Sequence, residues 1–169
     1  MSDLEIRQTR FGAPAAQQLV AAAQADLAER YGSGDENPIE AIEFDPPEGC
    51  FLVGWLAGEP VACGGWRTLA HFAEGDAAAA GGGVIGPEQI AEIKRMYVAP
   101  SARGTGVAAE LLSALIETAR AAGMRRMVLE TGLKQPEAIR FYEKHGFTRI
   151  KNYGYYRDAP DCVSFAIDL

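Results

Sequence analysis

The sequence has few residues of the kinds that build disulfide frameworks or metal sites. Among 169 residues there are three cysteines, Cys50, Cys63 and Cys162, and two histidines. An odd number of cysteines without metal-ligand spacing speaks against a fully paired disulfide framework and a cysteine-bound metal. The cysteine usage favours reduced thiols in a cytoplasm, and we expect no metal cofactor.

Long apolar segments are also missing. No apolar run approaches the roughly 18 residues that are needed to span a bilayer. The opening residues, MSDLEIRQTRFGAP, contain no apolar core of a secretory signal. We therefore expect a cytoplasmic protein without a membrane partner.

An excess of positive charge is absent too. The formal net charge is -7 at pH 7, which argues against a nucleic-acid partner because such proteins carry basic surfaces. Residues 1–88 hold 4 Lys/Arg and 14 Asp/Glu, whereas residues 89–169 hold 12 and 9. The more basic second half suits the binding of phosphate groups, but solvated surface charge with chance asymmetry stays open.

The composition and length indicate one globular domain over residues 1–169. The chain is 48% hydrophobic and 23% charged, which is ordinary for a soluble domain of this size. The alternation of apolar and polar residues predicts strands at 4–11, 50–58, 59–70, 90–100, 125–132, 147–156 and 162–169. Helices are expected at 14–31, 38–44, 104–123 and 136–145.

This order of elements predicts an α/β (α+β) fold with a mixed, mostly antiparallel sheet. One βαβ unit, at residues 90–132, lies at its centre, and the other strands are hairpin neighbours flanked by helices. The glycine-rich and alanine-rich segment 71–87 is expected to be a flexible loop. It is interpreted as a disordered insertion or a lid over a site.

A glycine pair stands directly before the helix predicted at 104–123. Gly104, Gly106 and Ala109 satisfy the dinucleotide-binding pattern G-x-G-x-x-G/A, with Glu130 as the acidic ribose ligand. However, Pro100 and its neighbours separate the strand from Gly104, and the upstream strands form hairpins. A pyrophosphate cradle at a helix N-terminus, or a loop without a ligand, are the other interpretations.

The surrounding residues resemble the GNAT superfamily of N-acetyltransferases. The segment VAPSARGTGVAAELL, which follows the strand EIKRMY, resembles the family's acetyl-CoA signature V-x-P-x-x-R-G-x-G followed by Ile or Val. About 30 residues later, PEAIRFYEKHGF resembles its A-x-x-F-Y-x-x-x-G-F element. The two motifs cover roughly residues 90–150, and the strand order agrees over most of the chain.

The resemblance implies how acetyl-CoA, the cosubstrate, is bound. Met96 and Val98 would pair through their backbone with the pantetheine arm, and the Val98 N–H would polarise the thioester carbonyl. Gln135 stands where the family commonly has Asn, at a position that contacts the cofactor. The backbone N–H groups that would cradle the pyrophosphate are those of Arg103, Gly104, Thr105, Gly106, Val107 and Ala108.

The resemblance also implies an enzyme that acetylates a primary amine by direct attack. Tyr142 matches the family tyrosine that protonates the departing thiolate. An alkyl ammonium with a pKa near 10.4 must lose a proton before it attacks. Glu92 and Glu130 match positions where family members carry the base, and either, or neither, could serve.

The acceptor cannot be read from the sequence. The acidic first half of the chain hints at a cationic acceptor, either a small molecule or a peptide amine. The sequence is also compatible with a homodimer. Two further alternatives remain: an acyl-CoA sensor without turnover and a dinucleotide-binding enzyme.

Overall fold

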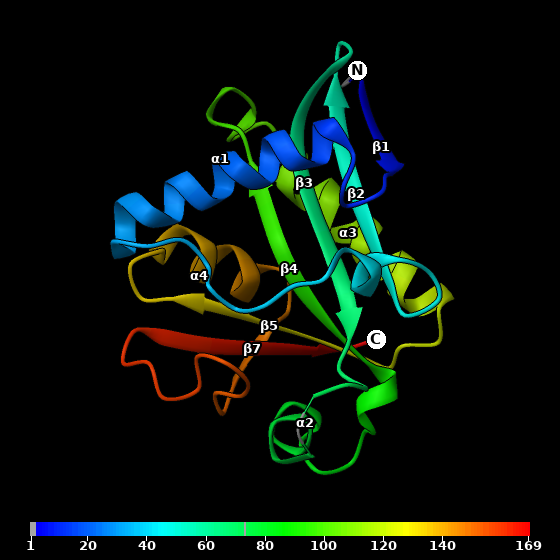
Figure 1. Ribbon diagram of the computed structural model, residues 1–169, viewed down its shortest axis with the longest axis vertical. Coiled ribbons are helices and arrows are strands. Elements are labelled where there is room, and N and C mark those ends of the chain that lie inside the picture. The colour runs from blue at the N-terminus through cyan, green and yellow to red at the C-terminus, as the bar shows by residue number, and fades with distance from the viewer. Residues whose placement is uncertain (1–2, 73) are drawn as a thin grey trace. The chain divides into compact units, whose positions relative to one another are not determined.

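A computed structural model of the chain describes residues 3–72 and 74–169, without the side chains of residues 73–77 (Figure 1). Seven strands form one mixed sheet in the order β1-β2-β3-β4-β5-β7-β6. The strands are β1 (Leu4–Gln8), β2 (Gly49–Leu56), β3 (Glu59–Thr68), β4 (Ile90–Val98), β5 (Arg126–Gly132), β6 (Thr148–Ile150) and β7 (Cys162–Asp168). The α-helices are α1 (Pro14–Tyr31), α2 (Glu74–Gly81), α3 (Val107–Ala121) and α4 (Pro136–Lys144).

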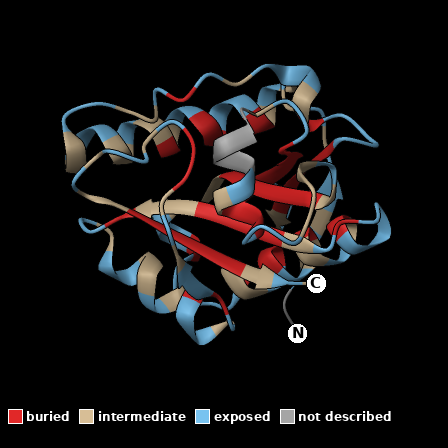
Figure 2. Ribbon diagram, turned by 90° about the horizontal axis from the view of Figure 1, so that it is seen from below, coloured by how far each residue is buried: buried red, intermediate tan, exposed pale blue. Residues whose placement is uncertain are grey.

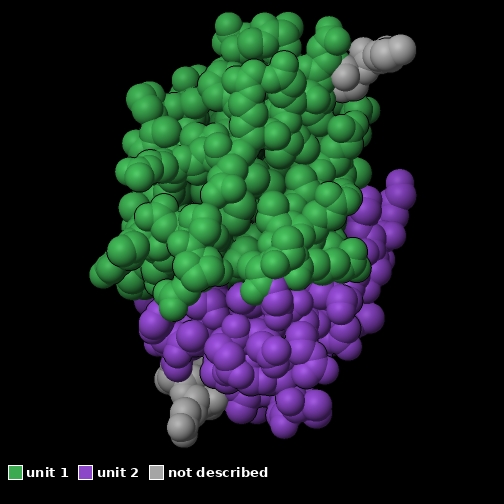
Figure 3. Space-filling view, turned by 90° about the vertical axis from the view of Figure 1, so that its right-hand side faces the viewer, with its two compact units in different colours: residues 1–67, 94–122 green, residues 68–93, 123–169 purple. Residues whose placement is uncertain are grey.

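The chain divides into two compact units, each made of two separate stretches (Figure 3). Unit 1 comprises Met1–Arg67 and Lys94–Ala122, and unit 2 comprises Thr68–Ile93 and Gly123–Leu169. The boundary falls inside β4, so this strand contributes its first residues to unit 2 and its last residues to unit 1.

In unit 1, α1 and α3 cover opposite faces of the β2–β3 hairpin. Val53 lies opposite Cys63 in the ladder, and both pack against the α1 residues Leu19 and Val20. Trp66 points to the other face because side chains alternate along a strand. There its indole N–H donates to the Thr118 hydroxyl of α3 at 2.9 Å. Figure 2 shows strands of the sheet largely buried and the outer sides of the helices exposed.

The limits of α1 follow from local chemistry. Pro14 stands at the first helical position, where a missing N–H costs nothing. Gly32 ends the helix in the left-handed region, with φ 85°, and its N–H donates to the Ala28 carbonyl. The helix predicted over residues 14–31 is confirmed.

In unit 2, β4 and β5 form a parallel pair through residues Ile90–Glu92, and helix α3 connects the two strands along the chain. This confirms the predicted βαβ unit. The β5–β7 and β6–β7 pairs of this unit are antiparallel, as are the β1–β2 and β2–β3 pairs of unit 1. The core of this unit includes Leu69, Ile90, Val128, Tyr153 and Ala166.

The strand predicted at 4–11 ends at Gln8, the helix predicted at 104–123 spans Val107–Ala121, and three further predictions differ more. Segment 71–87, predicted as a loop, contains helix α2, because the alanines of EGDAAAAG have the highest helix propensity. Residues Ala41–Phe44 form a 3-10 turn with a Glu40–Glu43 capping box rather than a full α-helix. The strand predicted at 147–156 is shortened to β6, since the chain leaves the sheet after Ile150.

A buried group of charges ties the segment after α1 to β4. The Asp35 carboxylate accepts from Lys94 Nζ at 2.8 Å and pairs with Arg95. Arg95 adopts φ 58° within the strand, which departs from extended geometry and lets two consecutive cations reach one carboxylate. Burial alone would raise the pKa of Asp35, but Lys94 and Arg95 lower it to about 2.

None of the helices in the described part of the chain combines the length and hydropathy that a membrane crossing requires.

We predict that Gly49→Ala destabilises the protein by roughly 1–3 kcal/mol, the range of an overpacked core. A Cβ at Gly49 would lie 2.0 Å from the Glu43 carbonyl oxygen and 2.7 Å from the Phe44 Cα, both backbone atoms. Gly12→Ala is the control, since nothing lies within 4 Å of its Cβ. Urea unfolding measures both variants, and equal stabilities would contradict the prediction.

Replacing Asp35 by Asn should lower the free energy of unfolding at pH 7 by about 2–3 kcal/mol. The folded pKa of about 2 lies below the ordinary 3.8, so the stabilisation is present above pH 4 and disappears as the pH falls through 2. The wild-type and Asp35→Asn unfolding curves should therefore converge near pH 2. Asp158→Asn, on an exposed side chain, is the control, and a pH-independent difference would count against this account.

Candidate functional site

The glycine loop enters α3 without a side-chain cap. Gly104 and Gly106 adopt φ 75° and 89°, a region that favours glycine. Gly106 is the N-cap residue of α3 and, as a glycine, makes no side-chain cap hydrogen bond. The first N–H groups of a helix lack intrahelical partners and lie at the positive end of its dipole. A Cβ on either glycine would meet nothing within 4 Å, so the loop can be approached closely.

Contacts with other residues of unit 1 hold the Arg103 side chain beside this loop. Its Nε donates to the Val98 carbonyl at 2.9 Å, and its guanidinium lies 5.7 Å from the centre of the Tyr97 ring. A looser ion pair, 3.9 Å, joins it to Asp26 of α1. The side chain is still 45% exposed, so a cation stands at the rim of the glycine loop.

The end of β4 presents backbone groups on the edge away from β3. The Ala99 N–H donates to the Val61 carbonyl of β3 at 2.8 Å. Neighbouring residues of a strand direct their backbone groups to opposite edges, and the Val98 carbonyl accordingly accepts from Arg103. Met96 lies two residues before Val98 in the strand, so its backbone groups are directed to the same edge as those of Val98. In unit 1 the predicted cofactor-binding residue Arg103 thus contacts Val98, another of the predicted residues.

Two features exclude the dinucleotide interpretation of this loop. The 3-10 turn Pro100–Ala102 separates β4 from Gly104, where a tight strand-to-helix turn is required. The sheet is mostly antiparallel, whereas that motif belongs to doubly wound parallel sheets.

In unit 2 the two candidate bases project from the same sheet face. Glu92 lies in register with Val128, and Glu130 is two residues further along β5. Glu92 is fully buried, with 0% of its surface exposed, and Glu130 is half-buried. The Tyr153 hydroxyl donates to Glu92 Oε1 at 3.2 Å. Sulfur of Cys162 lies 4.0 Å from Glu130 Oε1.

Tyr153 was not predicted as a site residue. Its pKa is raised by burial, and the nearby charges of Glu92, Glu130 and Cys162 raise it further. The phenol therefore stays protonated and serves as a donor. Ser164, opposite Glu130 in the ladder, is also fully buried, and its hydroxyl has no hydrogen-bond partner among the described residues. Strand alternation in CVSFAIDL could have indicated Cys162 and Ser164, but nothing local indicated Tyr153.

The two remaining predicted residues belong to α4. Tyr142 is buried, and its ring packs edge-on against Phe141 and Phe147 at 5.3 and 5.5 Å. Burial raises the pKa of its phenol, which keeps the hydroxyl protonated. Gln135 is the N-cap residue of α4, and its side chain does not cap the helix.

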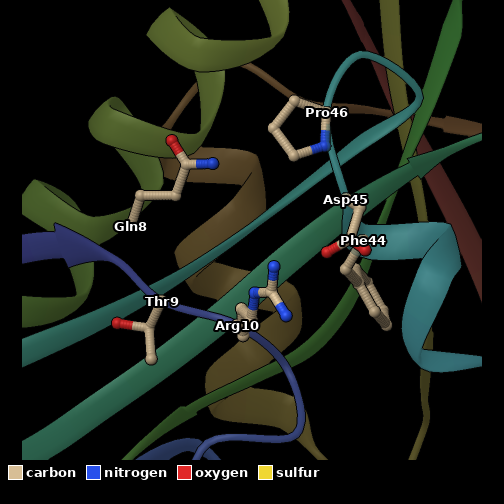
Figure 4. Close-up of a pocket in the computed structure, with 6 residues that line it drawn as sticks. All are labelled: Gln8, Thr9, Arg10, Phe44, Asp45 and Pro46. Atoms are coloured by element: carbon tan, nitrogen blue, oxygen red, sulfur yellow. The ribbon is translucent and has the colours of Figure 1, made fainter.

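A pocket of about 470 Å³ in unit 1 contains none of the predicted site residues (Figure 4). Arg10 and Asp45 are the charged residues among those that line it. Among the described residues no cluster of three or more His, Cys, Asp or Glu could hold a metal ion.

Comparison with known proteins shows the family and agrees with the fold. The Acetyltransferase (GNAT) family model matches residues 16–147. An IAA acetyltransferase of Azospirillum brasilense is 32% identical over 142 residues, which cover 84% of this chain and 81% of that protein.

Solved structures share the whole fold at low sequence identity. An acetyltransferase from Streptococcus agalactiae aligns with a TM-score of 0.71 at 17% identity, over 100% of both chains. A GNAT family acetyltransferase from Elizabethkingia anophelis with acetyl-CoA bound aligns with a TM-score of 0.66 at 16% identity, also over 100% of both chains. Together with the family match over most of its length, these likenesses show that the chain belongs to the GNAT family of acetyltransferases.

Proposed function

We propose that this acetyltransferase moves the acetyl group of acetyl-CoA to a primary amine by direct attack. The observation that carries the proposal is the fully buried Glu92 carboxylate, which accepts a hydrogen bond from Tyr153. A buried carboxylate held by a protonated donor is suited to accept the proton that an ammonium must lose. The acceptor is a small molecule or a peptide amine, and the acidic first half of the chain favours a cationic one.

The residues of unit 1 suit the binding of coenzyme A. The uncapped start of α3 and the open space at Gly104 and Gly106 fit a pyrophosphate. Arg103 would add a charge at the rim, and the remaining N–H donors would come from Thr105, Val107 and Ala108. The backbone of Met96 and Val98, on one edge of β4, would pair with the pantetheine arm.

The chemistry needs little beyond alignment and proton transfer, because a thioester is already activated. Glu92 would take the ammonium proton, either directly or through water, and the neutral nitrogen would attack the carbonyl carbon. A C–N bond forms, the C–S bond breaks, and sulfur leaves as a thiolate. The protonated phenol of Tyr142 would donate to that sulfur, and the second proton that the nitrogen loses as the amide forms would restore the phenol through solvent. Glu92 is favoured over Glu130 because it is the more buried and has the phenol donor.

The three cysteines are all thiols, which supports a cytoplasmic location.

Acetyl-CoA binding should depend on Gly106 beyond its effect on stability. Gly106→Ala and Gly123→Ala both place alanine at a strongly positive φ, 89° and 85°, with nothing within 4 Å. Each should lose roughly 1–2 kcal/mol of stability from the left-handed conformation. Calorimetric titration should show affinity for acetyl-CoA weakened about tenfold or more in Gly106→Ala and unchanged in Gly123→Ala. Equal affinities in both variants would remove the loop from the binding site.

Turnover with a panel of primary amines, followed by released thiol, tests the proposed reaction. We expect one or more amines to release thiol above the hydrolysis rate. Tyr142→Phe should then lower kcat about 100-fold, the usual contribution of a general acid, and leave acetyl-CoA affinity unchanged. Binding of acetyl-CoA without turnover on any amine would instead support a non-catalytic acyl-CoA sensor.

A further inference from the structure

The segment between β6 and β7 closes over the sheet face that carries the two glutamates. Tyr153 and Gly154 are its buried residues, and Gly154 adopts φ 73°. A Cβ at Gly154 would lie 3.6 Å from Glu130 Oε1 and 3.8 Å from Phe72 Cε1. The left-handed glycine therefore brings the backbone close to Glu130 while the preceding residue reaches Glu92.

Tyr153 is held from both ends of its side chain. Its ring belongs to an apolar cluster with Leu69, Ile90, Val128 and Ala166, and its hydroxyl donates to Glu92 Oε1. None of its surface is exposed. A ring that is packed on its apolar body leaves the hydroxyl few positions, so the hydrogen bond has a defined direction.

The segment itself is anchored, which keeps Tyr153 in place. Asn152 Nδ2 donates to the Cys162 carbonyl at 2.9 Å, and the Arg157 N–H donates to the Gly154 carbonyl at 3.2 Å. These contacts fix the chain on each side of Tyr153. At 3.2 Å its hydrogen bond to Glu92 is longer than the usual 2.5–3.0 Å of O–H···O bonds.

We propose that Tyr153 is a positioning residue, whose hydroxyl holds the Glu92 carboxylate in the orientation that accepts the acceptor's proton. The inference rests on the proposed amine acetylation. Groups that face the same region are Glu130 from β5 and, from β7, Cys162 and the Ser164 hydroxyl, which has no hydrogen-bond partner in the part of the chain that the structure describes. Tyr153 donates its hydroxyl hydrogen to Glu92 Oε1.

A double-mutant cycle with Tyr153→Phe and Glu92→Gln tests this role on an amine that the wild-type enzyme accepts. The phenylalanine keeps the packed ring and removes only the hydroxyl. We expect Tyr153→Phe to lower kcat about tenfold, with both KM values within twofold of wild type. In the Glu92→Gln background the same change should have no further effect on kcat, because there is no carboxylate left to orient.

Tyr155→Phe is the matched control, since Tyr155 lies in the same segment and is 53% exposed; its kcat should equal that of wild type. An unchanged kcat in Tyr153→Phe, or an equal loss in the Glu92→Gln background, would overturn the positioning role. If Tyr153→Phe does not fold, Tyr153→His and Tyr153→Leu replace it, because His keeps a hydrogen-bond donor and Leu has none. We then expect a higher kcat in Tyr153→His than in Tyr153→Leu, and equal values would overturn the positioning role.

The two proposals fail in different ways. A wild-type enzyme that acetylates no amine removes the proposed function and the positioning role together. An active wild type whose kcat is unaffected by Tyr153→Phe removes the positioning role alone.

Discussion

A carboxylate that is withdrawn from water must be hydrogen-bonded, because the cost of an uncompensated buried charge is several kcal/mol. In this protein that constraint applies to Glu92, which has no exposed surface. The phenol of Tyr153, delivered by the segment that follows β6, donates to it. The fully buried tyrosine, the left-handed Gly154 beside it and the anchoring of that segment are consistent with this one requirement.

Strand β4 carries Glu92 near its start and leads into the glycine loop after its end. Its first residues pair with β5 and carry Glu92, and its last residues lead to Arg103 and the glycine loop. Between them Arg95 departs from extended geometry, and Lys94 and Arg95 together bind Asp35. The irregularity is therefore held by buried ion pairs, in which loss of one partner is expensive.

The proposed reaction makes modest demands on such a scaffold. A thioester needs no covalent help from the enzyme, so a base, a proton donor and a rigid grip on the cofactor are enough. In the proposed reaction, the rate of acetyl transfer then depends on how well the Glu92 carboxylate is oriented in advance. The packed Tyr153 ring supplies a physical means for it.

Local sequence signals were enough to predict the limits of helices and the family of this protein. Pro14 and Gly32 mark the ends of α1, and the apolar spacing from Val107 to Ala119 marks α3. The motifs at residues 98–112 and 136–147 were sufficient to indicate the family, because glycine at a helix start and an aromatic pair at fixed spacing are short-range signals.

The tertiary structure alone decided which groups meet. Tyr153 and Glu92 are 61 residues apart in the chain, and their contact depends on where the segment after the shortened β6 turns back over the sheet. Segment 71–87 contains a helix although its glycines and low complexity predicted a loop. Local patterns report on backbone preference, whereas the partner of a buried side chain is set by packing between distant parts of the chain.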